Sequence, residues 1–99
     1  MRVIHKYTIP EGLVEWSTKM PAYAEILSVG RQGTAYVLWA SVETEQPMVA
    51  RHFLVLPTGV GHDALTKACA RFLGTVQTED NGYFFVVHIF DRGEHLSAI

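Results

Sequence analysis

The sequence predicts an α+β fold, in which a mostly antiparallel sheet of about six strands carries one short helix. Short apolar runs rich in β-branched and aromatic residues recur along the chain, separated by Gly, Pro or Asn. Asn81-Gly82 lies between two of these runs and is a strong β-hairpin signal. Residues 62–71 are the segment in which apolar residues follow helical spacing.

The expected strands are residues 2–9, 24–29, 34–42, 49–56, 73–78 and 83–90. Residues 13–20 are compatible with either a short strand or a loop. Glycines at both ends of residues 30–33 predict a tight turn that joins two strands in a hairpin.

A chain of 99 residues has room for a single domain, residues 1–99. Hydrophobic residues make up 48% of it and charged residues 18%, which is a globular composition. We expect an ordered core over about residues 2–91, followed by an exposed, loosely held tail over residues 92–99.

The charge pattern argues against nucleic-acid binding. The formal net charge is -2, and the eight Lys and Arg residues are scattered without a basic patch. The single cysteine, Cys69, excludes an internal disulfide. The N-terminal residues are charged, and no apolar run approaches the ~20 residues of a membrane span, so we expect a cytoplasmic protein.

Two of the expected strands are apolar on both faces. In an antiparallel sheet with one face exposed to water, only the other face needs apolar side chains. In residues 83–90 and 34–42 both sets of alternating side chains are largely apolar. A helix of about ten residues is roughly 15 Å long and cannot cover both faces. The chain is therefore expected either to form a homodimer or to curl into a closed monomeric barrel.

A candidate anion pocket lies between an expected strand and the expected helix. Gly59 and Gly61 follow Thr58 there, where backbone N–H groups and a helix dipole favour negative charge. The cations expected nearby are Arg51, His52, His62 and Lys67. The alternative is a tight strand-to-helix turn in which a glycine takes positive φ.

Catalytic and metal-binding patterns are lacking. The five histidines and Cys69 show no recognised ligand spacing, so we expect no metal and no cofactor. No nucleophile motif is present, and no catalytic residue is assigned. Three aromatic residues are candidates for an interaction surface, with the protein core as the alternative: Trp16, Tyr36 and Trp39.

Several motifs in combination resemble a known family. They are Ile4-His5-Lys6-Tyr7-Thr8-Ile9-Pro10, Met20-Pro21, residues 24–29, Leu38-Trp39-Ala40, residues 72–76 and Val86-Val87-His88-Ile89-Phe90. Together they make the chain similar to a family of small uncharacterised bacteriophage and prophage proteins, a domain of unknown function. The resemblance covers roughly residues 4–92 and implies a bacterial host cytoplasm.

Three functions follow as hypotheses. The leading one is a homodimeric protein that binds a host or phage protein and inhibits, for example, a host defence component, as the resemblance implies. The alternative is a binder of an anionic, nucleotide-like small molecule at residues 58–63. The third is a phosphate-ester enzyme with His52 or His62 as its acid or base.

Overall fold

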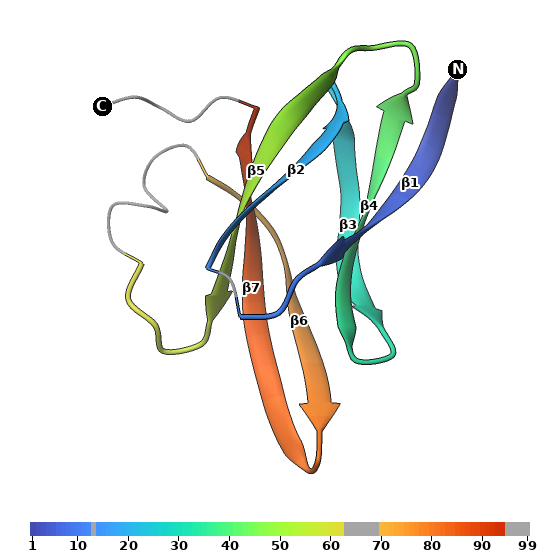
Figure 1. Ribbon diagram of the computed structural model, residues 1–99. Helices are drawn as coiled ribbons and strands as arrows, with labels where there is room; N and C mark the ends of the chain where they lie inside the picture. The colour runs from blue at the N-terminus through green and yellow to red at the C-terminus, as the bar shows by residue number, and fades with distance from the viewer. Residues whose placement is uncertain (13, 63–69, 95–99) are drawn as a thin grey trace.

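The computed structural model describes residues 1–12, 14–62 and 70–94, and in them the chain forms seven strands in two antiparallel sheets (Figure 1). The strands are β1 (Arg2–Ile9), β2 (Glu15–Pro21), β3 (Glu25–Gln32), β4 (Ala35–Glu43), β5 (Met48–Pro57), β6 (Arg71–Asp80) and β7 (Tyr83–Gly93). The three-stranded sheet has the order β1-β4-β3, and the four-stranded sheet has the order β2-β5-β7-β6.

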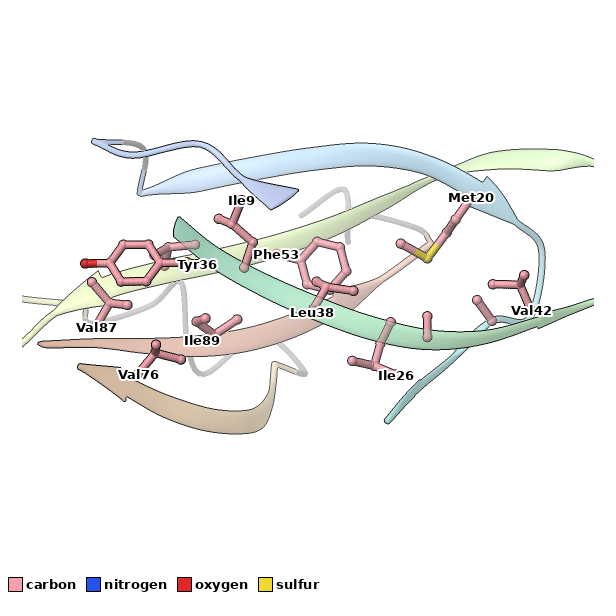
Figure 2. Packing of buried hydrophobic residues seen from close by; sticks show 13 residues of the cluster. Ile9, Met20, Ile26, Tyr36, Leu38, Val42, Phe53, Val76, Val87 and Ile89 are labelled. Carbon is pink, nitrogen blue, oxygen red and sulfur yellow. The ribbon is translucent and has the colours of Figure 1, made fainter. Parts of the chain in front are cut away.

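The two sheets face each other and enclose one hydrophobic core. Figure 2 shows the core side chains in a row between them, with Tyr36 and Val87 at one end and Met20 and Val42 at the other. Leu38 at the centre of β4 and Ile89 at the centre of β7 are fully buried. The smallest extent of the Cα trace is 16 Å, which fits two layers packed about 10 Å apart.

The chain crosses between the sheets at both ends of the sandwich. The β1–β2 and β2–β3 connections each change sheet, and so does the β4–β5 connection. On one side β3 contacts β6, so closely that a Cβ atom built on Gly74 would lie 2.7 Å from Val29 Cγ2. These crossings and contacts hold the two sheets in one unit.

Local sequence explains the two hairpins. Asn81 and Gly82 have φ values of 51° and 81°, and the turn they form joins β6 to β7 with Asp80 paired to Tyr83. Positive φ at both central residues is what a two-residue hairpin turn requires, and Asn-Gly tolerates it best. In the β3–β4 hairpin the turn lies at Gly33-Thr34, because β3 continues to Gln32 and pairs through to Ala35. The turn therefore lies at residues 33–34 and not at residues 30–33 as expected.

The α+β prediction is wrong: the described residues form an all-β sandwich and contain no helix. Residues 63–69, most of the expected helix, lie outside the described residues. Arg71, expected as the last residue of the helix, belongs to β6 and pairs with Asp91 of β7. The spacing of apolar residues predicts a helix up to this residue, but cross-strand pairing with β7 determines its conformation.

The sandwich also explains the strands that are apolar on both faces. Alternation in β5 directs Phe53 and Val55 into the core and Leu54 and Leu56 to the outer face, yet all four are buried within the single chain. A second chain is not needed to cover them. The homodimer stays a prediction.

Two boundary predictions change with the fold. Residues 13–20, left open between strand and loop, contain most of β2, which pairs with β5 along its length. β7 continues to Gly93, two residues into the tail expected over residues 92–99, and Asp91, the last residue of the expected core, is 7% exposed. Of the expected tail, residues 95–99 lie outside the described residues.

Candidate ligand cleft at the open end of the sandwich

A cleft opens where three connections diverge at one end of the sandwich, which we call the open end. It lies between the β1–β2 turn, the β3–β4 turn and the β6–β7 hairpin, whose tip projects past the other turns (Figure 1). Its volume is about 890 Å³. That is within the upper part of the range of ligand-binding clefts, about 300–1,000 Å³.

The cleft walls are mostly apolar. Val55 and Val87 form the inner wall from β5 and β7, and Val14 faces the cleft from the segment that precedes β2. Val55 and Val87 belong to the hydrophobic core, so the cleft is continuous with the interior.

A buried polar pair lies at the inner end of the cleft. The hydroxyl of Thr78 donates a hydrogen bond of 3.2 Å to the phenol oxygen of Tyr36, and both residues are buried. In Figure 2 the Tyr36 oxygen points away from Leu38 and Phe53, toward the open end. This bond uses the phenol oxygen as acceptor and does not use the phenol hydrogen.

Three consecutive aromatic residues, Tyr83–Phe85, begin β7 and form what we call the aromatic tip. Tyr83 is 72% exposed, Phe84 63% and Phe85 51%. Phe85 pairs with Thr78 and so shares the inner face, whereas its neighbour Phe84 is directed to the outer face. Both phenylalanines line the cleft. Such rings are more often buried, so their exposure together makes the aromatic tip a candidate interaction surface.

At the opposite end of the sandwich, which we call the closed end, a buried ion pair joins Arg51 and Asp91. Arg51 donates two hydrogen bonds to the Asp91 carboxylate, Nε to Oδ1 at 2.9 Å and a terminal nitrogen to Oδ2 at 2.6 Å. Its other terminal nitrogen donates to the Ala24 carbonyl at 2.8 Å, and Asp91 also accepts from Gly93 N–H at 2.8 Å. The bond to Asp91 raises the pKa of Arg51. This pair joins β5 and β7 to the β2–β3 connection.

The predicted anion residues are not brought together around residues 58–63. Arg51 lies seven positions before Thr58 on an extended strand, roughly 20 Å away, and is engaged with Asp91. His52 points to the opposite face of β5 from Arg51. Gly61 and His62 are exposed, and Lys67 lies outside the described residues.

The turn itself uses its backbone groups within the fold. Thr58 N–H donates to the Val86 carbonyl at 3.2 Å, and Val60 N–H donates to the Pro57 carbonyl at 3.3 Å. Gly59 has φ +89°, as the alternative of a tight turn requires. These two N–H groups are therefore not available to an anion.

His88, on the outer face of β7, contacts β6 on one side and the turn after β5 on the other. Its Nε2 lies 2.8 Å from Thr58 Oγ1 and its Nδ1 lies 2.9 Å from Thr75 Oγ1. By distance Thr58 and His88 could act as a nucleophile and base. An oxyanion would also need donors beside Thr58, and the N–H groups of Thr58 and Val60 already donate elsewhere. We therefore interpret the arrangement as a cross-strand polar link.

The predicted interface aromatics have three different environments. Tyr36 is 7% exposed and belongs to the core. Trp16 is half-buried and stacks on Phe53 with ring centroids 5.2 Å apart. Trp39 is half-buried on the outer face of β4, where its ring lies against Gly30. None of the three belongs to the aromatic tip.

The residues that sequence reasoning missed are Phe84, Phe85 and Asp91. The signal for the first two was present, because three aromatics directly after an Asn-Gly turn must lie at a hairpin tip and alternate between its faces. Asp91 gave no such signal, since its partner is 40 positions earlier in the chain.

Among residues 1–12, 14–62 and 70–94, no three His, Cys, Asp or Glu side chains lie close enough to hold a metal ion. The same part of the chain contains no helix of the length and apolar character that a membrane crossing needs.

Comparison with known proteins identifies the family to which the sequence is similar. A family model described as a domain of unknown function, DUF7352, matches residues 1–97. No curated protein and no solved structure matches the chain. The family description names no bacteriophage source, so the phage context expected from the sequence is not part of this finding.

Proposed function

Because the chain belongs to the DUF7352 family, whose function is unknown, we propose from its geometry that it is a binding protein whose open end engages a partner polypeptide. The observation that carries this proposal is the aromatic tip beside an apolar cleft. Phe84 and Phe85 are more than half exposed and border a cleft of about 890 Å³. Exposed aromatic side chains next to a cleft are the usual anchors of protein–protein interfaces.

The proposal favours a polypeptide over an enzyme substrate. The described cleft lining offers hydroxyls from Thr34, Tyr36, Thr58 and Thr78 and carboxylates from Glu11 and Glu79, but no histidine, cysteine or lysine. Apolar walls with a few polar groups suit recognition of a side chain better than proton transfer or nucleophilic attack.

A narrower form of the proposal, in which the partner is a host component blocked by a phage protein, rests on the sequence resemblance alone. The alternative of an anionic ligand at residues 58–63 is less favoured, because Arg51 is paired with Asp91 and two N–H groups of the turn are occupied.

Peptide selection tests the proposal. Immobilised wild-type protein is used to select binders from a library of random peptides displayed on phage, beside Phe84→Thr/Phe85→Thr and Phe72→Thr variants. Phe72 is a matched control because it is also exposed, at 55%, but lies at the other end of β6. We expect binders to the wild type and to Phe72→Thr that are lost on the double variant. Equal retention by the double variant, or no binders at all, would contradict the proposal.

A further inference from the structure

The charged groups of the cleft are all of one sign. Glu11, in the β1–β2 turn, and Glu79, on β6, are both exposed and are both among the residues that line the cleft. Glu79 pairs with Phe84, so its side chain lies with that of Phe84 on the outer face of the tip. Among the described lining residues there is no Lys, Arg or His. Arg31 pairs with Tyr36 across the β3–β4 hairpin, but it is exposed and outside the lining. Carboxylates beside low-dielectric walls concentrate cations at such a site.

The negative charge of the cleft lining favours some of the possible ligands over others. A second copy of the chain, docked by the same surface, would bring two negatively charged linings together with no Lys, Arg or His among their described residues, which costs free energy. An anionic ligand meets the same repulsion. A small cationic molecule would fill the cleft but leave the exposed rings of Tyr83 and Phe84 at the projecting tip uncovered. A polypeptide covers both the cleft and the aromatic tip.

We propose that the cleft binds a polypeptide segment carrying an aliphatic or aromatic side chain with a Lys or Arg one or two positions away. The apolar side chain lies between Val55, Val87 and Phe85, and the basic group lies either beside Glu11 or beside Glu79, which accompanies Phe84 on the outer face of the tip. The phenol hydrogen of Tyr36 donates to a carbonyl of the segment. This inference rests on the proposed function and adds the chemistry of the partner.

The experiment uses the peptides selected on the wild-type protein. We expect the enriched sequences to contain an apolar residue flanked by Lys or Arg, and to be depleted in Asp and Glu near it. One enriched peptide is then synthesised in three forms, with its basic residues kept, replaced by Gln, or replaced by Glu. Dissociation constants are measured by titration calorimetry at low and high salt.

Two charge variants separate the local effect from the net charge. Glu11→Gln/Glu79→Gln removes the cleft carboxylates, whereas Glu25→Gln/Glu45→Gln removes two exposed carboxylates outside the cleft lining. We expect about tenfold weaker binding of the basic peptide to the first variant and little change for the second. Salt should weaken binding to the wild type more than to Glu11→Gln/Glu79→Gln.

Each contrary result has a separate meaning. Enriched peptides without basic residues, or equal affinity for the Lys/Arg and Gln forms, would overturn the charge inference while leaving the proposed function intact. Failure to select any peptide would overturn the proposed function itself. Dimerisation that is lost in Phe84→Thr/Phe85→Thr would identify a second copy as the occupant and would also overturn the inference.

Discussion

The two ends of this sandwich handle polar and apolar groups in opposite ways. At the closed end, Arg51 and Asp91 are 11% and 7% exposed and satisfy each other with two hydrogen bonds. At the open end, Phe84 and Phe85 leave more than half of their surface in water. Charged groups are buried at one end and aromatic groups are exposed at the other.

This difference indicates that the closed end contributes more to the stability of the fold than the open end does. A buried ion pair with a third bond to the Ala24 carbonyl ties three segments together, and removing one member leaves a charge without a partner. An aromatic ring that is mostly exposed contributes little to folding, yet it adds to the free energy of binding when a partner covers it. The comparison can be tested by substitutions at each end, and we order them from the largest expected effect on stability to the smallest.

The largest effect is expected from Arg51→Met. The substitution leaves the Asp91 carboxylate buried without its cation and removes the donor to Ala24, so the free energy of unfolding should fall by about 3 kcal/mol. Urea unfolding monitored by tryptophan fluorescence measures it. The Arg51→Met/Asp91→Leu double variant is the control, and it should be more stable than Arg51→Met alone. A loss below about 1 kcal/mol would show that the closed end is not held by this pair.

A smaller effect is expected where the two sheets meet. In Gly74→Ala the new Cβ would approach Val29 Cγ2 to 2.7 Å, which forces β3 and β6 apart and should cost about 1–2 kcal/mol. Gly61→Ala is the matched control, because its Cβ meets nothing within 4 Å.

A second variant tests whether contact with Val29 causes the loss of stability in Gly74→Ala. In a Val29→Ala background the Cγ2 atom is gone, and Gly74→Ala should then cost nothing. If Gly74→Ala is as harmless as Gly61→Ala in the wild-type background, β3 and β6 do not approach as the structure has them.

Much of the strand content could be predicted from sequence, but the layering could not. Alternation and the Asn81-Gly82 turn predicted both hairpins, because those signals act between residues close in the chain. The division into two sheets depends on which strands pair across long separations, such as β1 with β4 and β5 with β7. Periodicity does not encode those partners, so apolar residues on both faces suggested a second chain or a closed barrel instead of a second sheet.

The candidate site shows the same limit. Glycines at residues 59 and 61 suggested an anion pocket with Arg51, but the partner of Arg51 is Asp91, which only the β5–β7 pairing brings near. The cleft joins Glu11, Tyr36 and Phe85, three residues whose proximity depends on the stacking of the sheets. The aromatic tip could have been predicted from the sequence, because Tyr83–Phe85 directly follow the Asn81-Gly82 turn.

A loss of about 1 kcal/mol is expected from Tyr36→Phe at the inner end of the cleft. Without the phenol oxygen, the buried Thr78 hydroxyl loses its acceptor. Tyr36→Phe/Thr78→Val replaces both partners by groups of similar shape and should recover most of the stability, as chemical denaturation will measure. Identical stability of wild type and Tyr36→Phe would contradict the hydrogen bond.

The most direct test of the central claim is the free energy of unfolding of Phe84→Thr/Phe85→Thr, with Phe53→Thr as the buried comparison. Threonine keeps strand propensity, so the change isolates the aromatic rings. We predict a combined loss below about 1.5 kcal/mol for the two exposed phenylalanines, against about 3–5 kcal/mol for Phe53, which is 1% exposed. A combined loss as large as that of Phe53→Thr would mean that the aromatic tip belongs to the core, and would contradict its role as a binding surface.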